Sequence, residues 1–99
     1  MVWSAEHEEI CCEIYLNEIL KKQSFSGDVK NRCVALAKER GVPHLDGSIK
    51  MKFQNIKAIC DLKGIKHVSP FMPMQHYSLK NLQAFEKVFA SYIEKTNMK

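Results

Sequence analysis

Apolar side chains recur with a helical period in four segments of this chain, and stretches rich in glycine, serine or proline separate them. Within 48–63, Ile49, Phe53, Ile56 and Cys60 fall at i, i+4, i+7 and i+11, which is one face of an α-helix. The same pattern predicts helices over about 4–22, 29–40, 48–63 and 78–95, and no segment convincingly predicts a strand. We therefore expect an all-α fold, a compact four-helix domain whose second and third helices form a loose helix-turn-helix.

Residues at the segment ends agree with these helices. Serine and aspartate are preferred N-caps because their side chains accept a hydrogen bond from the first turn. Glycine is preferred just after a helix because it adopts a left-handed backbone conformation. The expected N-caps are Ser4, Asp28, Ser48 and Ser78, and the expected C-terminal glycines are Gly41 and Gly64. The segment 65–77 has two prolines and no helical period, but it is apolar enough that we expect it to lie across the core.

The length and composition of the chain restrict its class. Ninety-nine residues, 45% of them hydrophobic, suit one folded domain. No apolar run approaches the roughly 20 residues that span a bilayer, and the N-terminus lacks the basic region of a signal peptide. These features predict a single domain over residues 1–99, in the cytoplasm and away from membranes.

The residues that usually carry catalysis or bind metals are scattered. Cys11, Cys12, Cys33 and Cys60 have neither disulfide nor zinc-ligand spacing, and we expect them to be reduced and mostly buried in the core. Redox chemistry at Cys11 and Cys12 is disfavoured because neighbouring glutamates raise a thiol pKa. The four histidines form no ligand motif and no glycine-rich phosphate loop occurs. We expect no cofactor, no metal and no enzymatic activity; a small enzyme is the least favoured interpretation.

A polar flank on the predicted third helix suggests nucleic acid as the ligand. Lys50, Gln54 and Lys57 fall at i, i+4 and i+7 beside the apolar stripe, and Asn55 lies further round. Lysine neutralises phosphates, and Gln or Asn can hydrogen-bond an adenine edge in the major groove of double-stranded DNA. The four residues expected to face DNA are Lys50, Gln54, Asn55 and Lys57, and the auxiliary phosphate contacts are Lys52, Arg32 and Lys30. The alternative for this flank is an amphipathic helix whose polar side simply faces water.

Charge is distributed unevenly. Five glutamates and no basic residue occur between Ser4 and Leu20, whereas all 15 Lys and Arg residues lie in the remainder. This asymmetry predicts an electric field that steers acidic ligands to the basic side. A solvated mixed surface remains the alternative.

Three stretches resemble the small N-terminal helical domain of bacterial HNH-endonuclease and restriction-type proteins, which carries an S-I-x-x-K-x-Q-N-I-x-A motif. In the third stretch of this chain, the matching residues are Ser48, Ile49, Gln54, Asn55, Ile56, Ala58, Gly64, Pro73 and Tyr77. The opening is similar through Trp3, Ser4, Glu6 and Tyr15, and the second predicted helix through Asn31, Arg32 and Leu36. Phe53 replaces a histidine of the motif.

The resemblance covers the helical domain and no nuclease region, so it does not imply nuclease activity for residues 1–99. It implies a helical domain that accompanies DNA-processing enzymes. We therefore expect a DNA-binding module that is accessory to a restriction or defence-type system, with a nuclease or other protein as a candidate partner. The alternative is a protein-interaction or dimerisation domain without nucleic-acid binding, with a surface made by the Phe71–Met74 loop and the acidic first helix.

Overall fold

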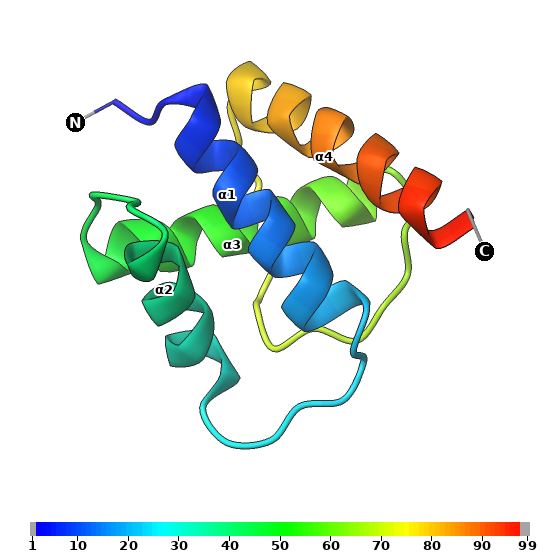
Figure 1. The fold of residues 1–99 in the computed structure, drawn as a ribbon, viewed down its shortest axis with the longest axis horizontal. Helices are drawn as coiled ribbons and strands as arrows, with labels where there is room; N and C mark the ends of the chain where they lie inside the picture. Colours follow the sequence, from blue (N-terminus) through cyan, green and yellow to red (C-terminus); the bar gives the residue numbers. More distant parts are fainter. Residues whose placement is uncertain (1, 98–99) are drawn as a thin grey trace.

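The computed structural model describes residues 2–97, and over this range the fold is all-α with four α-helices, as the sequence predicts (Figure 1). The elements are α1 (Ala5–Tyr15), η1 (Leu16–Leu20), α2 (Val29–Glu39), α3 (Asp46–Leu62) and α4 (Leu79–Asn97). Between residues 2 and 97, no helix combines the length and the apolar character needed to cross a membrane.

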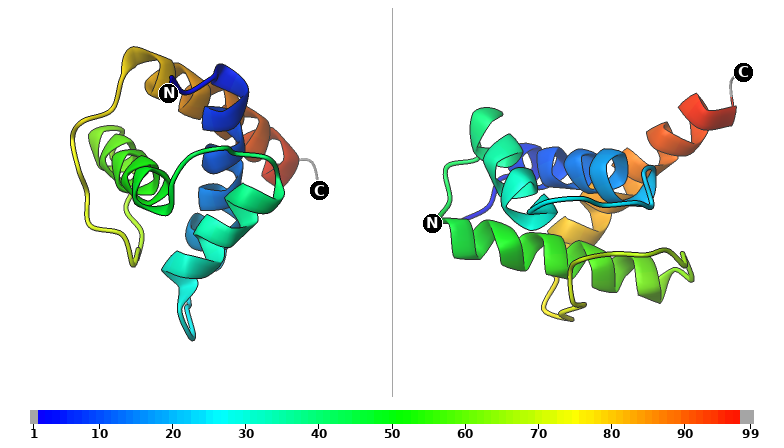
Figure 2. Two further views of the ribbon diagram at one scale, coloured as in Figure 1. Left: turned by 90° about the vertical axis from the view of Figure 1, so that its left-hand side faces the viewer. Right: turned by 90° about the horizontal axis from the view of Figure 1, so that it is seen from below.

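Helix α3 forms one side of the domain (Figure 2). Helix α1 packs against one side of it, and the segment 65–77 returns along another side (Figure 2). Helix α1 also contacts α2 and α4, so it touches every other helix of the domain. The segment 40–45 joins α2 to α3, and these two helices contact each other. Unlike the second helix of an open helix-turn-helix, α3 is therefore accessible over only part of its surface.

Three of the four predicted N-caps are confirmed. The side chains of Ser4, Asp28 and Ser78 accept hydrogen bonds from the backbone N–H groups three residues later. The prediction for Ser48 is wrong, because α3 begins at Asp46 and Leu45 occupies the N-cap without a side-chain hydrogen bond. The Asp46 carboxylate lies in the first turn of α3, where the positive end of the helix dipole stabilises its negative charge. It also pairs with Lys38.

The first predicted helix changes its geometry part-way. It is α-helical up to Tyr15 and then becomes the π-helical segment η1, where Lys21 N–H donates to the Leu16 carbonyl at 2.9 Å. Leu16 and Ile19 are both buried in this wider turn. A single uninterrupted α-helix over 4–22 is therefore wrong in geometry, although the extent of the helical segment is close to the prediction.

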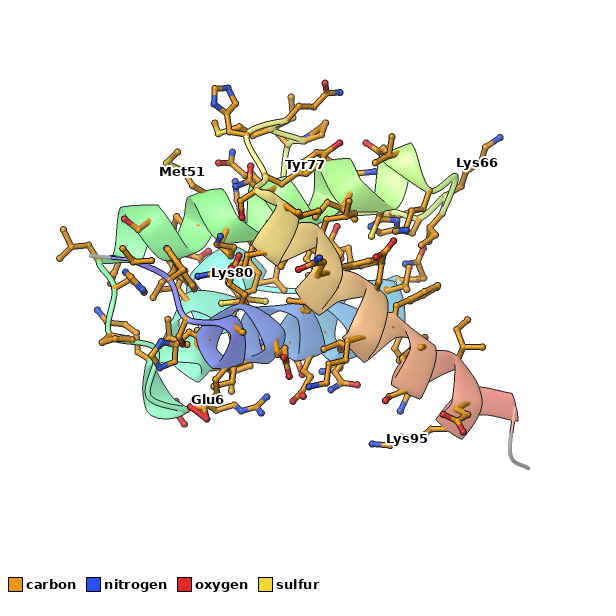
Figure 3. The ribbon with its side chains drawn as sticks, turned by 90° about the horizontal axis from the view of Figure 1, so that it is seen from above. Glu6, Met51, Lys66, Tyr77, Lys80 and Lys95 are labelled. Atoms are coloured by element: carbon orange, nitrogen blue, oxygen red, sulfur yellow. The ribbon has the colours of Figure 1, made fainter. Side chains whose placement is uncertain are left out.

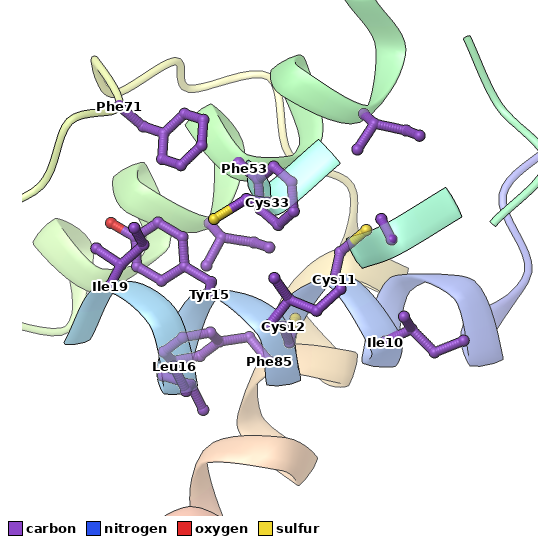
Figure 4. Close-up of a cluster of buried hydrophobic side chains, with 14 of the residues drawn as sticks. Ile10, Cys11, Cys12, Tyr15, Leu16, Ile19, Cys33, Phe53, Phe71 and Phe85 are labelled. Carbon is purple, nitrogen blue, oxygen red and sulfur yellow. The ribbon is translucent and has the colours of Figure 1, made fainter. Parts of the chain in front are cut away.

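The predicted apolar stripe of α3 is confirmed as core. Ile49, Phe53, Ile56 and Cys60 are fully buried. Phe71, from the returning segment, packs on Phe53 with ring centroids 5.1 Å apart and also approaches Tyr15 (Figure 4). The expectation that this segment crosses the core is therefore confirmed.

Hydrogen bonds hold the same segment in place. The Tyr15 hydroxyl lies 2.7 Å from His67 Nε2 and 2.9 Å from Ser69 Oγ. Burial raises the pKa of Tyr15 above its ordinary value and lowers that of His67, so burial favours the uncharged form of both groups. Hydrogen bonds between groups that favour their neutral forms therefore link the end of α1 to the returning segment.

The burial of Phe53 leads to a stability prediction. Phe53→Ala should lower the free energy of unfolding by roughly 3–5 kcal/mol, because truncating a buried aromatic leaves a cavity between α3 and Phe71. Urea denaturation monitored by circular dichroism would measure this loss. Met51→Ala on the same helix is the control, since Met51 is 46% exposed and its truncation should change stability by about 0.5 kcal/mol or less. Equal effects of the two substitutions would contradict the assignment of the buried face.

Candidate nucleic-acid interface

Lys50, Gln54 and Lys57 lie on the flank of α3 beside the apolar stripe, and all three are half-buried. Lys50 has no ion-pair partner among residues 2–97. Lys57, in contrast, has a side chain that is only 16% exposed and pairs with Asp61 at 2.6 Å. The structure therefore groups the three predicted residues, but it gives the charge of Lys57 a partner within the helix.

Lys52 is not a surface phosphate contact, and this prediction is corrected. Its ammonium lies 2.7 Å from a carboxylate oxygen of Glu8 on α1, and the Glu8 side chain is 1% exposed. The same ammonium sits 4.6 Å from the centre of the Trp3 ring. Lys52 follows Ile49 by three positions and precedes Ile56 by four, so it lies on the edge of the buried stripe and points toward α1.

Asn55 is also buried, which corrects its predicted role in reading a base. Its Oδ1 accepts a hydrogen bond from His76 N–H at 3.3 Å, and the neighbouring Gln54 carbonyl accepts one from Met74 N–H at 3.1 Å. These bonds fasten the end of the returning segment to the middle of α3. Asn55 therefore positions this segment and does not contribute to an open recognition surface.

Lys30 and Arg32 are exposed but lie far along the fold from Lys50. They occupy the first turns of α2, where the Arg32 guanidinium is 4.0 Å from Glu18 of η1. Helix α3 begins beside the opposite end of α2, where Lys38 pairs with Asp46 (Figure 1). The predicted phosphate contacts on α2 and the flank of α3 therefore do not form one continuous basic face.

The acidic first segment is used largely inside the domain. Glu8 pairs with Lys52 of α3, Glu9 with Lys87 of α4, and Glu13 with Arg40 at the end of α2. The glutamates that make the charge distribution of the sequence uneven thus form contacts that join α1 to the other three helices. Less of the positive charge remains available for an external ligand than the sequence suggests.

A small pocket, not anticipated from the sequence, lies beside the exposed part of α3. Its volume is about 150 Å³ and its lining is Trp3, Ser48, Met51, Lys52 and Asn55. His44 stacks on the Trp3 ring at 4.0 Å, and the Lys52 ammonium also lies over that ring, so the indole has little surface free for a stacking ligand. Trp3, Ser48 and Asn55 also match the family named in the sequence resemblance. That resemblance was the one sequence signal that could have grouped Trp3, at the start of the chain, with residues of α3.

The described residues contain no group of side chains arranged for catalysis or metal binding. Between residues 2 and 97, no group of three or more His, Cys, Asp or Glu side chains could hold a metal ion. The four cysteines are free and buried, as predicted for three of them from the apolar faces. Burial raises the thiol pKa of Cys11 and Cys60 to about 12 and that of Cys33 to about 11, and it raises that of Cys12 as well.

Comparison with known proteins adds no relative, since no family model, curated protein or solved structure matches the chain.

The buried thiols provide a prediction about reactivity. Because the thiolate is the nucleophile and its formation is suppressed by burial, all four cysteines should react far more slowly with an aromatic disulfide reagent at pH 8 than a free thiol does. After denaturation in guanidinium chloride, all four should react at the free-thiol rate. Absorbance of the released thiolate would follow both reactions. A cysteine that reacts rapidly in the folded protein would contradict the assignment of these side chains to the core.

Proposed function

We propose that this domain binds double-stranded DNA through the outer face of the first half of α3. The single observation that carries the proposal is that this face remains accessible, whereas the opposite face of the helix is buried in the core. Its accessible residues are Asp46, Gly47, Ser48, Lys50, Met51 and Gln54. The second half of the helix contributes less, since Lys57 is paired and the returning segment is fastened at Gln54 and Asn55.

The beginning of α3 suits an approach to DNA. Side chains near the N-terminus of a recognition helix are those that usually reach base edges in the major groove. Leu45 supplies no side-chain cap, so the first N–H groups of the helix are not satisfied by a capping side chain. A Cβ atom added at Gly47 would meet nothing within 4 Å, so the surface there is open. A phosphate could therefore approach this end of the helix on the side of Gly47, while the Asp46 carboxylate in the same turn is paired with Lys38.

The side chains of this face divide into two roles. Lys50 supplies positive charge to a phosphate, which contributes affinity without sequence preference. Gln54 can hydrogen-bond an adenine edge, and the exposed thioether of Met51 can contact the methyl group of thymine. Lys52 and Asn55 act indirectly, because they hold α1 and the returning segment against α3.

The biological setting of this proposal rests on the sequence resemblance. A domain of this kind would be an accessory DNA-binding module of a restriction or defence-type system, acting in the cytoplasm beside a nuclease or another protein. The pocket formed by Trp3, Ser48 and Asn55 supports the resemblance, because it gives three separated positions of the motif one shared location.

Protein interaction is the second candidate function, on a surface that includes the acidic first helix, as expected, but not Phe71. Phe71 is only 3% exposed and packs in the core, so the segment around it does not offer its aromatic side chain to a partner. A groove between α1 and α4, lined by Glu9 and Glu13 on one side and Lys87 and Lys95 on the other, is the surface that favours this candidate.

The proposal predicts distinct effects for Lys50 and Gln54. Fluorescence anisotropy with mixed-sequence duplexes at several salt concentrations should show affinity falling as salt rises, because binding releases counterions. Lys50→Ala should reduce the slope of log affinity against log salt by about one unit. Gln54→Ala should preserve the slope and relax discrimination at one base pair by about 1–3 kcal/mol.

Two lysines provide controls for this measurement. Lys66 is an exposed lysine beyond the end of α3 that is remote from Met51 (Figure 3). Lys66→Ala should therefore leave the salt slope nearly unchanged. Lys57→Ala should have a smaller effect than Lys50→Ala, because Lys57 is paired with Asp61. Absence of binding at low salt would remove the proposal, and an undiminished slope in Lys50→Ala would place the DNA contact elsewhere.

A further inference from the structure

A groove of about 260 Å³ runs between the first helical segment and α4, on a part of the molecule that the proposed DNA contact does not use. Its floor is apolar and consists of Leu16, Val88 and Tyr92, of which Leu16 and Val88 are buried. One wall carries Glu9, Glu13 and Asn17 from α1 and η1, and the other carries Lys87, Ser91 and Lys95 from α4.

The two helices that form the walls, α1 and α4, start side by side and point in roughly the same direction. Lys80 Nζ donates to the Trp3 carbonyl at 3.0 Å near the start of both helices, and Lys87 meets Glu9 at 3.3 Å further along. Beyond this point the helices diverge, and α4 extends away from the body of the domain (Figure 1). The groove is therefore closed at one end by an ion pair and opens toward Asn17 and Lys95.

The charges of the walls are opposite in sign and only partly satisfied by one another. The Lys87 side chain is 72% exposed although it contacts Glu9, and Lys95 is exposed without an ion-pair partner among residues 2–97. Glu13 uses one carboxylate oxygen for Arg40 and is still 42% exposed. Both walls can therefore accept further partners of opposite charge.

A groove with one acidic and one basic wall is complementary to itself. A twofold axis through the groove would turn a second copy so that its basic wall faces the acidic wall of the first, and the reverse contact would form at the same time. An exclusively acidic or basic partner would be attracted by one wall and repelled by the other. Charge complementarity thus favours a second copy of this chain as the occupant.

We propose that the α1–α4 groove is a homodimer interface, in which Lys87 and Lys95 of each copy face Glu9 and Glu13 of the other and the apolar floors are buried between them. Glu6 and Lys95 lie on the side of the domain opposite Met51 and Tyr77 (Figure 3). The dimer would therefore leave both α3 faces accessible. The interface does not depend on DNA binding, so either proposal can fail without the other.

Reversal of one wall at a time tests the interface. Glu9→Lys with Glu13→Lys makes both walls basic, and Lys87→Glu with Lys95→Glu makes both walls acidic. Sedimentation equilibrium of the unmodified protein should show a monomer–dimer equilibrium that weakens with salt. Each reversed variant alone should dimerise at least about tenfold more weakly, because like charges then face each other across the twofold axis. An equimolar mixture of the two variants should recover the association as a heterodimer.

A matched control separates this effect from a change in net charge. Lys30→Glu with Lys66→Glu alters the net charge as much as the Lys87 and Lys95 reversal does, but at lysines that do not line the groove. This control should dimerise like the unmodified protein, and circular dichroism should show that all variants are folded. The proposal is overturned if the unmodified protein is monomeric at all concentrations, if the reversed variants dimerise normally, or if their mixture stays monomeric.

Discussion

The buried ion pair between Glu8 and Lys52 is the interaction on which the arrangement of this domain depends. The two side chains are 1% and 10% exposed, and their charged atoms are 2.7 Å apart. Removing two charges from water costs several kcal/mol for each ion, and only close contact offsets this cost. The pair therefore constrains α1 to one position against α3. Trp3 lies over the Lys52 ammonium, so the same pair also fixes the start of the chain beside α3.

This constraint determines which surfaces remain for binding. With α1 held against α3 by Glu8, Glu13 and Glu9 lie within reach of Arg40 at the end of α2 and Lys87 of α4, and they pair with these residues. The returning segment then covers part of α3 through its contacts with Gln54 and Asn55. Two accessible features follow from this packing. They are the first half of α3, for which we propose DNA as the ligand, and the groove between α1 and α4, for which we propose a second copy as the partner.

Most of the fold, and less of the candidate site, could be predicted from the sequence. The stripe containing Ile49 and Phe53 was predictable because helical periodicity reports directly which face is buried. The burial of Lys52 could not be predicted, because lysine is usually exposed and its partner Glu8 is 44 positions away in the sequence. Asn55 was equally ambiguous, since an amide can read a base or bind a backbone segment. The start of α3 was missed because Ser48 is a good capping residue, whereas the helix begins without a side-chain cap after Leu45.

The most direct test of the central role of the ion pair is a double-mutant cycle on its two members. The free energy of unfolding would be measured for Glu8→Gln, Lys52→Met and the double substitution. Each single change leaves a buried charge without its partner and should cost about 3–5 kcal/mol. The double substitution should cost less than the sum by at least about 1 kcal/mol, because it removes both charges. Costs that add to within about 0.5 kcal/mol would contradict the claim that this pair holds α1 against α3.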